Sequence, residues 1–319
     1  MVKPSPRSWV VLWIVVLLFP MLAYAQQPRR GGPLRNSRLY RGYSNYGIMK
    51  LAAGSGTSTY FGDLCETGDC LNARPYVNLG FNYRFGGRVQ VRGEMAYFRL
   101  ANQDFGGKNL RRNLSFRSGN AEVGITGVFE LFTYNKFFAK RPLFSPYTFV
   151  GVGMAYIAPR ARLGNEWYTL PKYDTEGVNY SQFVPVIPMG IGVQIPLNPI
   201  LDLNLEASYR KTFSDYLDDV STVYTDNAAL RARDPIAAEL ADRTSEVSRP
   251  GYDSQDGVHW NAGHKRGNPD KKDGYIVLAA KLEYTLNPLV KVRRQNIKFR
   301  RPRFSSGSSG GSRGGRRKR

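Results

Sequence analysis

The sequence predicts an all-β fold, an eight-stranded antiparallel transmembrane β-barrel of the outer-membrane type, with long outer loops and a disordered, basic C-terminal tail. Three observations support this prediction. An export signal begins the chain, several segments alternate apolar and polar residues with a period of two, and short and long connections alternate between those segments. The expected location is therefore the cell outer membrane. The 20 Tyr and 17 Phe suit the aromatic girdles of a barrel, although an aromatic-rich soluble β-sandwich would share that composition.

The first 25 residues are typical of a cleaved secretory signal. Lys3 and Arg7 provide a basic start, residues 9–19 are all apolar, and Ala-Tyr-Ala at residues 23–25 forms a cleavage site. A membrane anchor is the alternative interpretation. It is disfavoured because 11 apolar residues fall well short of the ~20 that a spanning helix needs.

The clearest strand covers residues 76–85, where Val77 and Leu79 share one parity and Asn78 has the other. Successive side chains of a strand point to opposite faces, so this segment has one apolar face and one polar face. Residues 89–97 repeat the pattern with Arg and Glu on the polar side. Such charges suit a polar barrel interior better than the packed core of a soluble protein.

Six further segments complete the predicted barrel. The fourth, seventh and eighth strands alternate clearly, the sixth places its apolar residues on one parity, and the fifth is rich in glycine. Each is long enough for the ~9–11 residues of a tilted spanning strand. The eight predicted strands cover residues 46–54, 76–85, 89–97, 120–132, 146–157, 183–195, 201–210 and 275–286.

The connections alternate in length. Residues 86–87 and 196–199 form short links, whereas the links after the first, third, fifth and seventh strands are long, the last covering residues 212–273. Tight periplasmic turns and extended external loops are typical of outer-membrane barrels. Residues 133–145 are longer than a periplasmic turn should be. In the last loop, Asp234-Pro235 predicts the start of a short helix.

Charged residues also occupy the predicted inward parity, six of each sign. An eight-stranded barrel is filled by its own side chains, and buried charges must be paired, so equal numbers predict a salt-bridge network rather than an ion pathway. The alternative is that half of these charges lie at wet rims, which also disfavours a wide pore. The cations are Lys50, Arg84, Arg88, Arg92, Arg210 and Lys281, and the anions are Glu94, Glu122, Glu130, Asp202, Glu206 and Glu283.

Net charge is concentrated at the two ends of the chain. Removal of the signal, with its two basic residues, lowers the net charge from +21 to +19. The first segment after the signal has five Arg and no acid, and the C-terminal segment has 12 Lys or Arg and no acid. The expected organisation is a signal at 1–25, a basic periplasmic segment at 26–45, a barrel at 46–286 and a basic periplasmic tail at 287–319.

The basic tail carries the main functional signal. A basic run alone would indicate nucleic acid, but a periplasmic tail meets none. Anionic lipid headgroups, peptidoglycan or an acidic protein surface are the partners available there, and a solvated tail without specific contacts is the alternative. The candidate partner-docking residues are Arg293, Arg294, Arg300, Arg301 and Arg303.

Cys65 and Cys70 are expected to form a disulfide that closes a small loop, with free thiols as the alternative. In an exported chain this pairing is the simplest interpretation of two cysteines so close in sequence. A metal site would require further thiols or histidines nearby, and the neighbouring sequence has none.

No catalytic constellation and no cofactor motif emerges from the sequence. The two histidines lie in the long outer loop among several acids, and a second acidic group precedes them. Both are interpreted as ordinary polar loop residues rather than as a metal site or a loose calcium site. The residues concerned are His259 and His264 with Asp253, Asp256 and Asp270, and then Asp215, Asp218 and Asp219.

The order of short motifs resembles the PorG-type outer-membrane barrels. The likeness runs from about residue 46 to residue 164 and returns in the last two strands. This chain departs from the pattern in its long 212–273 loop and in its basic tail. The most specific block is a Tyr-x-Gly-Asp-Leu motif followed by Arg-Pro, which here comprises Tyr60, Gly62, Asp63, Leu64, Arg74 and Pro75.

That family is associated with type IX protein secretion and gliding motility. The resemblance implies a non-enzymatic, structural barrel that seats the periplasmic lipoprotein ring of the secretion machinery. The residues themselves indicate no cofactor, small-molecule substrate or nucleic acid. Two alternatives stay open. One is a small porin or adhesin that acts through its outer loops, and the other is a lipid-modifying enzyme. The enzyme would need a polar catalytic pair at the lipid interface, which the sequence does not identify.

Overall fold

The structure is a computed structural model that describes residues 47, 49–64, 72–104, 112–132, 141–198, 200–246 and 262–286. Several predictions lie outside these residues. They concern the signal at 1–25, the basic segment at 26–45, the Cys65–Cys70 disulfide, His259, and the tail at 287–319 with its arginines.

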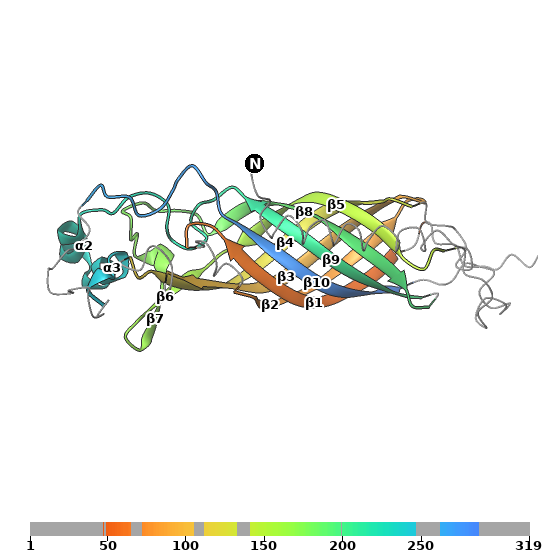
Figure 1. The fold of residues 1–319 in the computed structure, drawn as a ribbon, viewed down its shortest axis with the longest axis horizontal. Helices are drawn as coiled ribbons and strands as arrows, with labels where there is room; N and C mark the ends of the chain where they lie inside the picture. Colours follow the sequence, from red (N-terminus) through yellow and green to blue (C-terminus); the bar gives the residue numbers. More distant parts are fainter. Residues whose placement is uncertain are drawn as a thin grey trace, which may run out of the picture.

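Eight long antiparallel strands form a closed barrel (Figure 1). Each pairs with its neighbours in the chain; β1 pairs with β10, and the β3–β4 pairing completes the ring, so every strand has two partners. The predicted eight-stranded fold is thus confirmed. The barrel strands are β1 (Met49–Phe61), β2 (Arg74–Arg84), β3 (Val89–Gln103), β4 (Ser115–Glu130), β5 (Ser145–Tyr156), β8 (Phe183–Pro196), β9 (Leu201–Thr212) and β10 (Gly274–Thr285).

The outer surface of the barrel is apolar and its interior is polar, the reverse of a soluble protein. Leu79, Ile125 and Ile191 point outward with 57%, 61% and 66% of their surface exposed, whereas Asn82 and Arg84 are buried inside. Exposing so many large apolar side chains to water would be strongly unfavourable, because each costs about 1.5–3 kcal/mol relative to burial. The belt they form is therefore a lipid-facing surface.

Several strands extend beyond the ranges that alternation predicts. β1 continues to Phe61, β3 continues to Gln103, and β4 begins at Ser115, where the β3–β4 ladder still pairs residue to residue. These extensions lie at one end of the barrel, where the outward side chains include Arg99 and Arg117. Alternation fails to reveal them because side chains beyond the lipid no longer need to be apolar.

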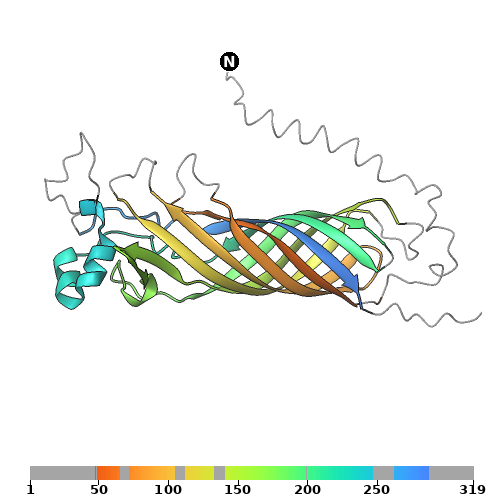
Figure 2. The ribbon, with the colours of Figure 1, turned by 90° about the horizontal axis from the view of Figure 1, so that it is seen from below.

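The two ends of the barrel differ (Figures 1 and 2). At the turn end, two connections are short, at residues 85–88 and 197–200, and the β4–β5 connection at residues 131–144 is long, as the sequence indicated. β1 begins and β10 ends at this end of the barrel. At the loop end, long connections carry extra elements beyond the barrel. These are β6 (Pro159–Leu163), β7 (Glu166–Thr169), η4 (Leu170–Lys172), α2 (Asn227–Arg233), α3 (Pro235–Ala241) and η5 (Thr244–Glu246).

The loop-end elements pack on one another. β6 pairs with the end of β4, and Leu240 of α3 packs against Ala161 of β6 and Leu170. Helix α3 confirms the helix predicted at Asp234-Pro235, because the Asp234 side chain accepts a hydrogen bond from the Ile236 amide at 2.9 Å. In the part of the chain that the structure describes, no helix has the length and apolar character to cross a membrane.

Candidate functional site

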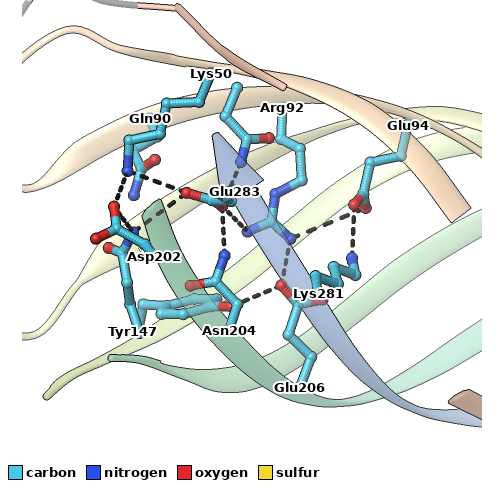
Figure 3. A network of polar contacts seen from close by, with 12 residues as sticks. Lys50, Gln90, Arg92, Glu94, Tyr147, Asp202, Asn204, Glu206, Lys281 and Glu283 are labelled. Atoms are coloured by element: carbon cyan, nitrogen blue, oxygen red, sulfur yellow. Dashed lines mark hydrogen bonds and ion pairs between the residues drawn. The ribbon is translucent and has the colours of Figure 1, made fainter. Parts of the chain in front are cut away.

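Polar side chains fill the barrel interior toward the turn end (Figure 3). Nζ of Lys50 lies 2.5 Å from Oδ2 of Asp202 and 3.1 Å from Oε2 of Glu283. The side-chain amides of Asn82 and Asn204 donate hydrogen bonds to the other carboxylate oxygen of Glu283. All five side chains are buried, so a cation and protein donors replace water around these carboxylates.

Glu206 forms a second centre in the same layer. Its Oε1 lies 2.5 Å from Nη1 of Arg92 and accepts a hydrogen bond from the Tyr147 hydroxyl at 2.6 Å, while its Oε2 lies 2.7 Å from Nζ of Lys281. Lys281 also lies 2.6 Å from Oε1 of Glu94. Cations and anions from β3, β9 and β10 therefore alternate across the interior, and Figure 3 shows their side chains converging.

Two further pairs extend this charge network. Arg84 pairs with Glu130, and Nε of Arg210 lies 3.5 Å from Oε1 of Glu122. Eleven of the twelve charged residues expected on the inward parity thus lie in the barrel interior.

Arg88 and Arg141 differ from the expectation. Arg88 is exposed in the turn before β3, so its predicted inward position is wrong; strand parity does not extend into a turn. Arg141, which the sequence did not single out, is buried with its Nη1 3.2 Å from Oδ1 of Asp202. It lies between β4 and β5, where no strand pattern indicates a direction. With Arg141 in place of Arg88, the charge network of the described residues still holds six cations and six anions.

An apolar layer fills the interior toward the loop end. Phe98 and Tyr275 stack with ring centroids 4.6 Å apart, and Tyr60 meets Phe116 edge-on at 5.0 Å. Leu217 and Val220 of the β9–β10 connection join the same cluster and are 0% and 1% exposed. We call residues 213–223 the plug, because part of an outer loop closes the barrel mouth from within.

The Tyr60 hydroxyl fastens the plug to the barrel. Its oxygen lies 2.6 Å from Oδ2 of Asp218 and 2.8 Å from Oδ1 of Asp273. A phenol has one proton to donate, so one of these carboxyl groups must itself carry a proton. Burial raises the pKa of Asp218 to about 8, and burial with the neighbouring Asp218 charge raises the pKa of Asp273 well above its usual range.

A second buried contact holds the plug from the other side. Nη1 of Arg266 lies 2.9 Å from Oε1 of Glu176, and its Nη2 lies 3.6 Å from Oδ2 of Asp219. Burial raises the pKa of Asp219 to about 6. Although burial opposes ionisation of Glu176 as well, Arg266 and the Ser221 amide hold the pKa of that carboxyl below its usual range.

Part of the Tyr-x-Gly-Asp-Leu motif at the end of β1 and in the first outer loop contacts the plug and its neighbours. Tyr60 binds the plug directly, and Leu64 is buried in the apolar cluster. Oδ2 of Asp63 accepts a hydrogen bond from the Asn268 amide at 2.5 Å. A side chain at Gly62 would collide with Asp273 and Tyr60, so that position requires glycine. Arg74 and Pro75 begin β2, where they pair with Ser58 and Thr57 of β1.

The aspartates considered for calcium have separate partners. Asp215 accepts a hydrogen bond from the Ser221 hydroxyl at 2.7 Å, and Asp219 accepts one from the Thr175 hydroxyl at 2.5 Å. Within the described ranges, no group of three or more His, Cys, Asp or Glu side chains is arranged to hold a metal ion.

These features define an outer-membrane β-barrel protein. The barrel is closed, has an even number of antiparallel strands, carries an apolar outer belt, and has two short turns at one end and long loops at the other. The protein is therefore located in the outer membrane, surrounded by its lipid.

The chain belongs to the family described as Domain of unknown function (DUF6089), whose model matches residues 41–233. No curated protein matches it.

Solved structures of other outer-membrane barrels are similar to this chain. Ail, the attachment invasion locus protein of Yersinia pestis, is 12% identical over 75% of this chain and 99% of Ail, with a TM-score of 0.36. OprG from Pseudomonas aeruginosa is 11% identical over 76% of this chain and 98% of OprG, with a TM-score of 0.37. Neisserial surface protein A is 10% identical over 74% and 96%, with a TM-score of 0.36. Likeness of this degree says nothing about function.

Glu206→Gln should destabilise the barrel strongly, because it leaves Arg92 and Lys281 without their shared carboxylate in a buried site. Breaking a buried ion pair on one side costs about 3–5 kcal/mol. Glu246→Gln is the matched control, because its pair with Arg243 is partly exposed and contributes at most about 1 kcal/mol. Urea unfolding in phospholipid vesicles measures both; equal losses would contradict the role of the network.

The plug should loosen as the pH rises. The protonated Asp218 carboxyl stabilises the packed plug, and burial raises its pKa to about 8. This contribution to stability is complete below about pH 4, the pKa of aspartate in the unfolded chain, and is lost as the pH rises through about 8. Hydrogen exchange at Leu217 and Val220, corrected for intrinsic rates, should show lower protection at pH 9 than at pH 6. Asp218→Asn cannot titrate at this position and should reduce the difference, and the double variant Asp218→Asn/Asp273→Asn should reduce it further, because the buried Asp273 carboxyl also has a raised pKa. An unchanged pH dependence in the double variant would refute the assignment.

Proposed function

We propose that this protein is a non-enzymatic outer-membrane anchor that seats the periplasmic ring of a type IX protein secretion machinery, the system that also serves gliding motility. On this proposal the barrel itself transports nothing. It provides a rigid, lipid-embedded base, and its turn end presents basic segments to the ring.

The observation that carries the proposal is the filled interior. The charge network occupies the turn-end half, the apolar cluster occupies the other half, and the plug closes the mouth. Paired side chains such as Arg92 and Glu206 are almost fully buried. A barrel without a water-filled passage acts through its ends rather than through a pore.

The geometry of the chain ends supports docking at the turn end. Lys50 near the start of β1 pairs with Thr285 at the end of β10, so the segments before and after the barrel leave from neighbouring positions. Those segments, residues 26–45 and 287–319, contain five and 12 basic residues and no acid. Together they would present a concentrated positive charge to an acidic surface of the ring.

A second candidate function is adhesion through the loop end. The ordered cap of β6, β7, α2 and α3 supports it, because a cap packed around Leu240 and Leu170 provides a stable surface beyond the membrane. The porin alternative is less well supported, since the interior is filled by side chains.

Two variants of the tail test the docking role. The first deletes residues 287–319, and the second replaces Arg293, Arg294, Arg300, Arg301 and Arg303 with Gln. Both should reduce crosslinking of ring components to the barrel and reduce secretion, because the positive charge that would bind the ring is lost, while the barrel remains in the outer membrane. The readout is recovery of ring lipoproteins after mild crosslinking and purification of the barrel.

A variant that removes a similar amount of positive charge at the loop end serves as the control for the five-arginine variant. Lys172→Gln, Arg231→Gln, Lys265→Gln and Lys271→Gln together remove four exposed cations from the opposite end of the barrel. Full ring recovery and secretion in both tail variants would overturn the docking role. Loss of adhesion in the loop-end control with normal secretion would favour the second candidate.

A further inference from the structure

A row of aromatic side chains marks the edge of the lipid belt near the loop end. Tyr97 of β3, Tyr156 of β5 and Phe183 of β8 are 49%, 39% and 63% exposed. Each is the last large apolar side chain on the outward face of its strand toward the loop end, and they are neighbours across the sheet, because Ala121 of β4 pairs with both tyrosines and Tyr156 pairs with Phe183. Outward aromatic rows of this kind lie at the boundary between hydrocarbon and headgroups.

Four arginines lie on the same outward face beyond this row, and we call them the arginine face. They are Arg99, Arg117, Arg160 and Arg162, and all four are exposed. Arg99 is two residues nearer the loop end than Tyr97 on β3. Because β4 runs in the opposite direction, Arg117, four residues before Ala121, is also nearer the loop end. A strand tilted by ~40° rises about 2.6 Å per residue along the barrel axis, so these arginines lie about 5 and 10 Å beyond the row. That is the depth of the headgroup layer and its surface.

The β6–β7 hairpin completes the face. Arg160 pairs directly with Arg117, and Arg162 pairs with Trp167; directly opposite residues in a sheet point to the same side. The Arg117 guanidinium lies 5.9 Å from the centre of the Trp167 ring. Trp at this level is typical of membrane interfaces.

This concentration of like charge lacks an internal counter-charge. Like charges directly opposite one another, such as Arg117 and Arg160, destabilise a sheet. Over the part of the chain that the structure describes, no carboxylate forms an ion pair with any of the four arginines. The nearest acid of the hairpin, Glu166, lies on the opposite parity and bonds to Tyr168. An external anion would balance the face.

We infer that the arginine face binds the phosphate groups of anionic lipids in the leaflet around the loop end of the barrel. Guanidinium groups match phosphate oxygens with two parallel hydrogen bonds, which makes arginine the preferred side chain for this contact. The position beyond the aromatic row places Arg99 at the depth of the lipid headgroups and places Arg117 and the opposite Arg160 at their outer surface, with Arg162 two residues further out along β6.

The test uses the full-length mature protein in neutral phosphatidylcholine nanodiscs that contain either bis-phosphorylated lipid A or its dephosphorylated form. Lipid retained by the purified barrel is quantified after detergent extraction. The wild type should retain the phosphorylated lipid. R99Q/R117Q/R160Q/R162Q should bind this lipid at least about tenfold more weakly, and its binding should depend less on salt concentration. R160Q/R162Q alters only the hairpin outside the barrel and should show an intermediate loss.

The control is the loop-end variant K172Q/R231Q/K265Q/K271Q, which removes the same charge from exposed positions outside the arginine face. It should retain the phosphorylated lipid like the wild type. Three results would overturn the inference: undiminished retention in both arginine variants, equal retention of the dephosphorylated lipid, or equal loss in the control. Inositol hexakisphosphate that binds the detergent-solubilised barrel as tightly as lipid A would assign the face to a soluble anion instead.

Discussion

The need to pair every backbone amide inside lipid governs this structure. No water reaches the hydrocarbon region, so a sheet is stable there only when it closes on itself, as β3–β4 and β1–β10 do here. Closure divides each strand into an outward and an inward parity. The outward parity must then be apolar because lipid surrounds it, and the inward parity is free to carry charge. The apolar belt and the interior charge network are both consequences of this closure.

The interior in turn determines where the protein can act. Eight strands enclose a space that side chains fill, and the six cations and six anions inside stabilise one another in place of water. Toward the loop end, Leu217 and Val220 complete an apolar cluster, so an outer loop becomes part of the barrel interior. With both halves occupied, partners would meet the protein at the ends of the barrel, and the described surface beyond the lipid belt at the loop end is the cap and the arginine face.

Period-two alternation is strong enough to predict all eight barrel strands, because lipid constrains the outward parity of every one. The same reasoning weakens where lipid ends. It misses the loop-end parts of β1, β3 and β4 and the β6–β7 hairpin. It also assigns an inward position to Arg88, which lies in a turn, and it overlooks the buried Arg141. The Tyr60 contact with Asp218 joins residues 158 positions apart, and no local pattern indicates such a contact.

The most direct measurement of the central claim is spin-label accessibility along β4. Single cysteines at positions 121–129, in a chain whose two native cysteines are replaced by serine, would carry the label in lipid vesicles. Labels at Val123, Ile125 and Phe129 should be accessible to oxygen dissolved in lipid, and labels at Glu122 and Thr126 should be inaccessible both to oxygen and to a water-soluble nickel reagent. Loss of the two-residue period, or nickel access at the inward positions, would contradict a sealed barrel in lipid.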